Sequence, residues 1–278
     1  MPPFADKVKR LDRSRLLLRR RYGEPLRLIV THPVEHVLRA ILAEEASAAE
    51  VDQAIERFRR HFADMNDLRV SHPREIREAL GADFPRATYK ARIIPRLLDQ
   101  VFKQHNSMVW DFLEPMGKME VRAYFECLED VRPFIAATLA RDCAGAHAFP
   151  VDNDVARVFG RLGILDSAAE TETEMQAFLE RAVKASRAYE AHWLIKRLAE
   201  DLCLPDKPRC ERCPLNAFCP SVVPASKKKA ASRGKAGAKK QPKSTAAAKP
   251  KREKLACRTG RPDYRTGRSG DAARKKRR

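Results

Sequence analysis

The sequence predicts an all-α body followed by a basic C-terminal segment. Apolar residues recur at helical spacing through most of residues 1–220, and the alternating, Val-rich segments typical of strands are nearly absent. The composition then changes, because residues 221–278 contain 21 lysines and arginines but only 3 acidic residues. In residues 1–220 the charges nearly balance, with 35 basic and 34 acidic side chains. The net charge of +19 therefore belongs almost entirely to the C-terminal segment.

Turn and cap residues divide the body into roughly nine to ten helices. A basic amphipathic helix comes first and ends near Tyr22 and Gly23. Pro33, a residue favoured in the first helical turn, begins the second helix, which ends near Ser47. The same apolar period predicts further helices over residues 51–62, 72–80, 86–104, 119–128, 133–142, 151–163, 171–183 and 186–201.

The composition also excludes several classes of protein. Charged residues make up 33% of the 278 residues and no run of 18 apolar residues occurs, so no segment is predicted to span a membrane. The N-terminus lacks the unbroken apolar segment and the cleavage site of a signal peptide. We expect a monomeric, cytoplasmic and nucleoid-associated protein.

The basic segment, residues 221–278, is expected to be disordered, because it has too few large apolar residues to offset the entropy cost of ordering. A polycation that neutralises phosphates releases counterions, which predicts salt-dependent binding to DNA. Lys227, Lys228 and Lys229 are its candidate DNA-binding residues. A merely solubilising tail and an anionic membrane are the alternatives, although no amphipathic helix accompanies the charge.

Four cysteines lie close together at the end of the body, at Cys203, Cys210, Cys213 and Cys219. Their spacing is C-x6-C-x2-C-x5-C. Four thiolates on one short loop favour a soft centre, either zinc or an iron–sulfur cluster. Structural zinc usually takes two CxxC-type pairs, and only Cys210 and Cys213 form such a pair here.

This cysteine spacing at the end of an all-helical body resembles the endonuclease III group of helix–hairpin–helix DNA glycosylases. Residues 207–210 (Lys-Pro-Arg-Cys) and 191–195 (Ala-His-Trp-Leu-Ile) are similar to the family's segments around the first two cysteines. The resemblance implies a two-lobed fold, double-stranded DNA as the partner, and a [4Fe–4S] cluster held by the four cysteines, with zinc as the alternative. It also makes the loop cations candidates for phosphate contact, namely Lys207, Arg209 and Arg212.

The resemblance implies four parts of the chain. Residues 1–32 would form an N-terminal helix packing with the iron–sulfur lobe, and residues 33–147 a six-helix lobe with a degenerate helix–hairpin–helix. Residues 148–220 would form the iron–sulfur cluster lobe, and residues 221–278 the disordered Lys/Arg/Ala-rich tail.

Residues 151–158 (VDNDVARV) are similar to the family's segment that carries its catalytic aspartate, which falls on Asp152. In the family this carboxylate stabilises oxocarbenium character as the N-glycosidic bond breaks. Asp152 also comes directly before an apolar helix, where a carboxylate typically caps the first backbone amides. Asp152 is therefore a candidate for both roles.

Four positions depart from the family pattern. In the hairpin, residues 128–136, Asp130 and Arg132 replace two glycines; Asp130 is unfavourable beside a phosphate, whereas Arg132 could contact one. Phe134 aligns with the family's Schiff-base lysine, and without an amine the family's β-lyase chemistry should be absent. Glu45 aligns with a glutamine that the family inserts into the DNA stack.

These residues predict a DNA-binding iron–sulfur protein of base excision repair. Its expected activity is that of a monofunctional DNA glycosylase without lyase activity, using Asp152 and a bound water on a flipped base. The alternative is a non-catalytic DNA-binding or structure-sensing protein that binds through its basic tail.

Overall fold

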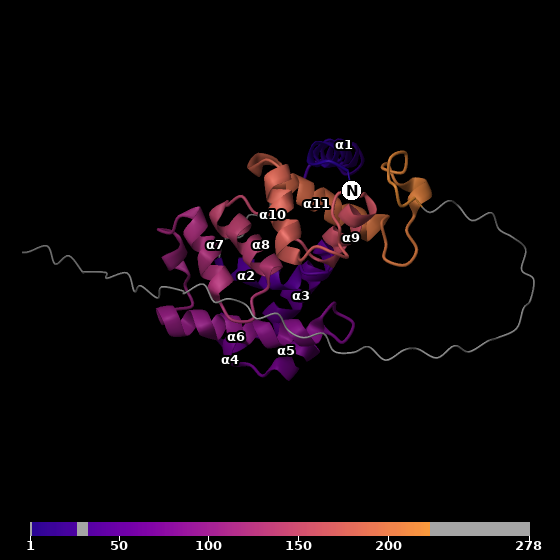
Figure 1. The fold of residues 1–278 in the computed structure, drawn as a ribbon. Helices are drawn as coiled ribbons and strands as arrows, with labels where there is room; N and C mark the ends of the chain where they lie inside the picture. Colours follow the sequence, from indigo (N-terminus) through magenta and orange to yellow (C-terminus); the bar gives the residue numbers. More distant parts are fainter. Residues whose placement is uncertain (1, 27–32, 223–278) are drawn as a thin grey trace, which may run out of the picture. The chain divides into compact units, whose positions relative to one another are not determined.

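The computed structural model describes residues 2–26 and 33–222, and all regular structure in these ranges is helical (Figure 1). The prediction of an all-α body is therefore confirmed for the described residues. The helices are α1 (Phe4–Tyr22), α2 (Pro33–Leu42), α3 (Ala48–His61), α4 (Met65–Val70), α5 (Pro73–Leu80), α6 (Ala87–His105), η1 (Asp111–Leu113), α7 (Lys118–Cys127), α8 (Pro133–Ala144), α9 (Asn153–Arg161), α10 (Glu172–Ala182), α11 (Ala185–Asp201) and η2 (Cys210–Arg212).

One helix was not predicted, and the ends of several others differ from the prediction. α2 ends at Leu42 rather than near Ser47, and α3 begins at Ala48 rather than at residue 51. α4 was not predicted, because its six residues are too few to show a helical period; Asp64 begins it by accepting hydrogen bonds from the Asn66 and Asp67 amides at 2.8 Å. α9 begins two residues later than predicted, because Asp152 is extended and acts as its N-cap. The start of α9 shows that a side-chain cap rather than periodicity decides where a helix begins.

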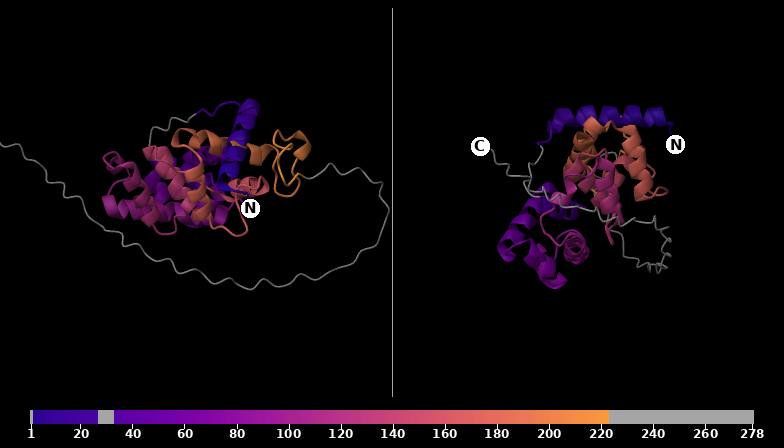
Figure 2. Two further views of the ribbon diagram at one scale, coloured as in Figure 1. Left: turned by 45° about the horizontal axis from the view of Figure 1, so that its top comes forward. Right: turned by 90° about the vertical axis from the view of Figure 1, so that its left-hand side faces the viewer.

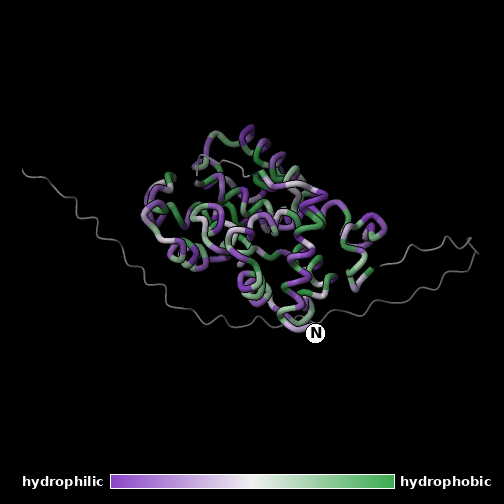
Figure 3. Tube along the Cα trace, turned by 90° about the horizontal axis from the view of Figure 1, so that it is seen from above, coloured by the Kyte–Doolittle hydropathy of each residue, from purple (hydrophilic) through white to green (hydrophobic). Residues whose placement is uncertain are grey.

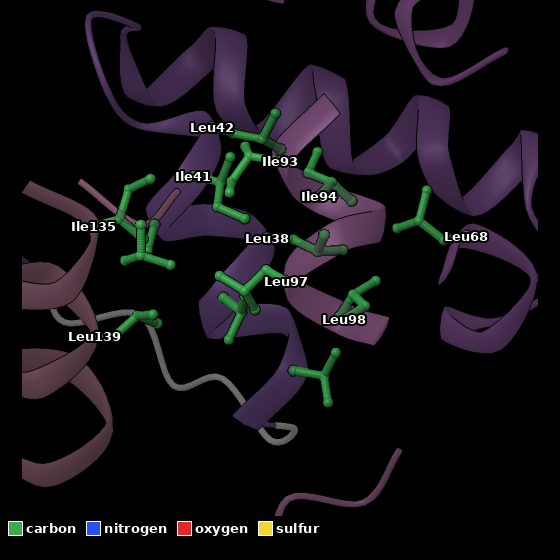
Figure 4. Close-up of a cluster of buried hydrophobic side chains, with 14 of the residues drawn as sticks. Leu38, Ile41, Leu42, Leu68, Ile93, Ile94, Leu97, Leu98, Ile135 and Leu139 are labelled. Atoms are coloured by element: carbon green, nitrogen blue, oxygen red, sulfur yellow. The ribbon is translucent and has the colours of Figure 1, made fainter. Parts of the chain in front are cut away.

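The first hydrophobic core lies among α2 to α8. Leu38 and Ile41 of α2 and Leu97 of α6 are at most 1% exposed, and Figure 4 shows them facing Ile135 and Leu139 of α8. Truncating one such side chain to alanine typically costs about 2–5 kcal/mol. This core fixes α8, which follows the hairpin, against α2.

The second hydrophobic core joins both ends of the described chain. Leu11 and Leu18 of α1 pack in one cluster with Phe159 of α9, Leu194 of α11 and Leu215 of the cysteine loop. Figure 2 shows α1 lying across the C-terminal helices, and Arg15 of α1 pairs with Glu190 of α11 at 2.8 Å. The basic amphipathic helix near the N-terminus therefore packs against the helices that precede the cysteines.

The hydropathy of the trace alternates along the helices, as Figure 3 shows by the change between green and purple segments. No helix within residues 2–26 and 33–222 is both long and apolar enough to cross a bilayer. The predictions for the basic tail, including Lys227, Lys228 and Lys229, lie outside the described residues.

Candidate functional site

Asp152 lies immediately before α9, and its carboxylate accepts three hydrogen bonds. Oδ1 accepts from the Val155 amide at 2.9 Å, which is the N-cap bond. Oδ2 accepts from the Glu45 amide at 3.1 Å and from Lys196 Nζ at 2.7 Å. The Asp152 side chain is 0% exposed, so both oxygens are used inside the protein.

Lys196 of α11 holds this carboxylate and its neighbour together. Its Nζ lies 2.7 Å from Asp152 and 3.0 Å from Asp154, which also pairs with Arg157 at 2.6 Å. Burial alone would lower the pKa of Lys196, but the two carboxylates outweigh it and the pKa is raised. The positive charges of Lys196 and Arg157 balance the negative charges of the two aspartates, so this group of four side chains is neutral as a whole.

Sequence analysis missed Lys196, although a signal for it exists. Lys196 follows His192 by four residues on α11, so it lies at the edge of the face that buries His192 and Ile195. A lysine at the edge of an apolar face predicts a buried cation that needs a partner. The partner could not be inferred, because it lies 44 residues away in the sequence.

The turn between α2 and α3 is fixed from two sides. Glu45 has a left-handed backbone with φ of 59°, and its side chain accepts hydrogen bonds from Asn153 at 2.6 Å and Arg86 at 3.3 Å. Lys90, which is 0% exposed, donates to the Leu42 and Glu44 carbonyls at 2.8 and 2.7 Å. Burial lowers the pKa of Lys90 to about 8. The residue aligned with the intercalating glutamine is thus held within the protein.

The hairpin between α7 and α8 keeps its turn without glycine. Asp130 takes the left-handed conformation, with φ of 62°, and its side chain pairs with Arg96 at 2.8 Å. Arg132, a candidate for phosphate contact, pairs with the buried Glu44 at 3.0 Å and with Glu172. Both Arg132 partners are carboxylates, so its charge is already balanced in this structure.

A cavity of about 350 Å³ lies between α2, α3, α8 and α11. Phe134 and Thr138 of α8 and His192 and Lys196 of α11 are part of its wall, and Asp152 is not. Phe134 is 1% exposed, and its ring centre lies 6.4 Å from that of His192. Burial lowers the pKa of His192 well below its usual range, and Arg141 and Lys196 lower it further. The wall at the position of the family's amine is therefore aromatic and uncharged.

The four cysteines all lie half-buried on the loop after α11. Arg161 at the end of α9 organises this loop: its Nη1 lies 3.4 Å from Cys203 Sγ and donates to the Leu204 carbonyl at 2.6 Å. Burial raises the pKa of the Cys213 thiol, and the three other cysteines raise it further.

Four thiols on one loop are the donor set that an iron–sulfur cluster or zinc takes, so the residue types fit such a centre. In the part of the chain that the structure describes, however, no three His, Cys, Asp or Glu side chains are arranged closely enough to hold a metal ion. The cluster therefore stays a prediction. The loop cations predicted to contact DNA, Lys207, Arg209 and Arg212, are exposed.

Solved structures of known proteins share this fold. A trapped endonuclease III–DNA covalent intermediate, an estranged-adenine complex, is 20% identical with a TM-score of 0.62, over 80% of this chain and 97% of that chain. A non-covalent endonuclease III–DNA complex is 18% identical with a TM-score of 0.61, over 80% and 97%. A thermostable thymine-DNA glycosylase is 16% identical with a TM-score of 0.57, over 78% and 97%. No protein-family model and no curated protein sequence matches the chain.

The described helices therefore have the fold of these solved structures, among them endonuclease III and a thymine-DNA glycosylase. The fold agrees with the resemblance to the endonuclease III group that the cysteine spacing indicated. The likeness defines the fold, and the chemistry depends on the side chains that this chain places around Asp152.

Proposed function

We propose that the protein binds double-stranded DNA and recognises a single extruded base, as a monofunctional DNA glycosylase of base excision repair. The observation that supports this proposal best is the cavity beside the Asp152–Lys196 pair. Its volume of about 350 Å³ falls within the range of about 300–1,000 Å³ that ligand pockets occupy. Its wall combines apolar and aromatic side chains with polar and charged ones, and such a wall can hold a flat heterocycle that carries hydrogen-bonding groups.

The side chains in the wall of the same cavity disfavour lyase activity. A lyase of this kind needs an amine that forms a Schiff base with the sugar. Phe134 has no amine, and Lys196 holds its ammonium against two carboxylates that raise its pKa, which disfavours the nucleophilic neutral form. Removal of the base by water would leave an intact abasic strand.

Product analysis tests this function. Full-length protein is incubated in excess with duplexes that each contain one modified base, such as uracil, hypoxanthine or 7-methylguanine. We expect strand breaks that appear only after alkali treatment, no adduct trapped by borohydride, and loss of product in Asp152→Asn. Strand cleavage without alkali or a trapped adduct would contradict the monofunctional assignment.

A second candidate function, binding without excision, is favoured by the environment of Asp152. Its two oxygens already accept three hydrogen bonds, and its side chain is 0% exposed. A carboxylate neutralised by a lysine is a weaker stabiliser of developing positive charge. Binding of a modified-base duplex in preference to an unmodified one, with no abasic product at enzyme excess, would support this candidate over the first.

The iron–sulfur cluster is part of the proposed function. The four loop cysteines would hold it, and when bound it would order a loop that has little core of its own. Iron and sulfide analysis of anaerobically purified protein tests this assignment. We expect both in the wild type, neither in Cys213→Ser, and both in Cys143→Ser, because Cys143 lies on α8 outside the loop. Zinc in place of iron and sulfide would contradict it.

The basic tail is proposed to supply most of the non-specific DNA affinity, because the body is nearly neutral. Full-length protein and a chain ending at residue 222 can be compared for binding to unmodified duplex over a range of salt concentrations. We expect the shorter chain to bind more weakly and with a flatter salt dependence. Equal affinities and slopes would place the binding surface elsewhere.

A further inference from the structure

The charges in the cavity wall are arranged unevenly. Three arginines of the wall pair with carboxylates that are also in the wall, at 2.7–3.3 Å: Arg39 with Asp52, Arg141 with Asp142, and Arg197 with Glu200. Two wall histidines, His36 and His192, have pKa values lowered by burial, which favours their neutral forms.

Lys196 is the exception in this arrangement. It is part of the wall, but its partners Asp152 and Asp154 are not. Lys196 therefore brings a positive charge to the wall, and the two carboxylates that pair with it belong to residues outside the wall. Because the side chain is only 11% exposed, water screens this charge poorly.

The hydrogen bonds of Lys196 are incomplete. An ammonium group has three donors. Two of them reach Asp152 and Asp154, at 2.7 and 3.0 Å, and no third acceptor is found within residues 2–26 and 33–222. An occupant of the cavity that offers a carbonyl oxygen could accept the third hydrogen bond, and a charge-assisted bond of this kind is stronger than a neutral one.

We propose that Lys196 is the specificity-determining residue of this cavity: it favours neutral bases that carry a carbonyl oxygen and excludes bases that carry a positive charge. The proposal rests on the proposed function, because it takes the occupant to be an extruded base. A cationic base would meet the ammonium group in a site of low dielectric, where like charges repel strongly. A base without an acceptor would leave a buried donor unpaired, which also costs binding free energy.

Equilibrium binding tests the proposal without requiring excision. Three duplexes that differ at a single nucleotide are compared. This nucleotide carries guanine, hypoxanthine or 7-methylguanine, and its 2′-fluoro sugar resists cleavage of the glycosidic bond. All three bases have the same ring carbonyl, and only 7-methylguanine is positively charged. For the wild type we expect the hypoxanthine duplex to bind about tenfold or more tightly than the 7-methylguanine duplex.

The variants separate charge from structure. Lys196→Arg keeps the charge and should keep the preference, whereas Lys196→Met should reduce it to within about threefold. Because Lys196→Met leaves the Asp152 carboxylate without its cation, the double variant Asp152→Asn/Lys196→Met is measured as well, and it should also lose the preference. Lys103→Met makes the same substitution on an α6 side chain that is 74% exposed and should behave as the wild type.

The outcomes distinguish the two proposals. If the wild type prefers both modified bases over guanine equally, and Lys196→Met changes nothing, the specificity role of Lys196 is wrong while base recognition stands. If the wild type binds all three duplexes equally, base recognition itself fails and the specificity proposal fails with it. The proposal is supported if the wild type binds the hypoxanthine duplex more tightly than the 7-methylguanine duplex, and if Lys196→Met and the double variant both abolish this preference.

Discussion

The start of α9 and the hairpin before α8 differ in opposite ways from the pattern of the family that the sequence resembles. At α9 the residue of the family pattern, Asp152, is retained, but Lys196 now binds its carboxylate at 2.7 Å. At the hairpin the family's glycine is replaced by Asp130, but the backbone keeps the left-handed conformation, with φ of 62°. One region keeps the residue in a changed environment, and the other keeps the conformation with a changed residue.

The difference shows why identity at a motif position is a weak guide to function. The resemblance made Asp152 a candidate for catalysis as well as for the N-cap, and its neighbours make it part of a neutral, buried cluster. Asp130 was predicted to be unfavourable beside a DNA phosphate, and its backbone keeps the positive φ of the turn, which aspartate is among the few residues besides glycine to tolerate. What has changed at the hairpin is its charge, because Asp130 and Arg132 are both committed to ion pairs.

The largest effect is expected where the cluster at α9 is broken. Lys196→Met should destabilise the protein by about 3–5 kcal/mol, because it leaves a buried carboxylate without its cation. Urea unfolding measures the change, and Asp152→Asn/Lys196→Met should recover part of the loss. The exposed control Lys103→Met should change stability by less than about 0.5 kcal/mol. A similarly small effect of Lys196→Met would mean that the ion pair contributes little.

A smaller and pH-dependent effect is expected at the turn that carries Glu45. Burial lowers the pKa of Lys90 from 10.5 to about 8, so between these pH values the unfolded chain binds more protons than the folded one. This group therefore makes the protein more stable as the pH rises through that window. In Lys90→Met the gain should be absent, by a difference on the order of 1–3 kcal/mol between pH 7 and pH 10. Parallel pH profiles for wild type and variant would contradict the buried position of Lys90.

The hairpin should respond to backbone conformation by a smaller amount. Glycine adopts positive φ without strain, whereas alanine does not, so Asp130→Gly should be more stable than Asp130→Ala by about 1 kcal/mol. Both variants lose the exposed pair with Arg96 equally, which makes their difference specific to the backbone. Equal unfolding midpoints would show that the turn relaxes to another conformation.

The smallest effect concerns the charge of the hairpin. Asp130→Asn keeps a residue that tolerates the left-handed conformation, removes one negative charge and releases Arg96 from its pair. Binding to unmodified duplex should tighten by about two- to threefold at low salt and less at high salt. Unchanged affinity at low salt would place the hairpin away from the DNA.

Local sequence patterns were sufficient for the longer helices and for the cap at Asp152, because both depend on residues close together in the chain. They could not give Lys196 or Lys90, because a helical period defines a face but not the groups that meet it. The partners of these lysines are 42 to 48 residues away. The common centre indicated by the cysteine spacing stays a prediction, and the structure places Arg161 against Cys203 and Cys219.

The central claim is that the cavity beside the Asp152–Lys196 pair is where a base is recognised. Ala43 is part of the cavity wall, so Ala43→Phe would fill the space, while Val70→Phe adds the same ring at a position that is 65% exposed. The measurement is the ratio of affinities for a hypoxanthine duplex and an unmodified duplex. We expect Ala43→Phe to abolish the preference without weakening binding to unmodified DNA, and Val70→Phe to retain it. A preference that survives in Ala43→Phe would contradict the account.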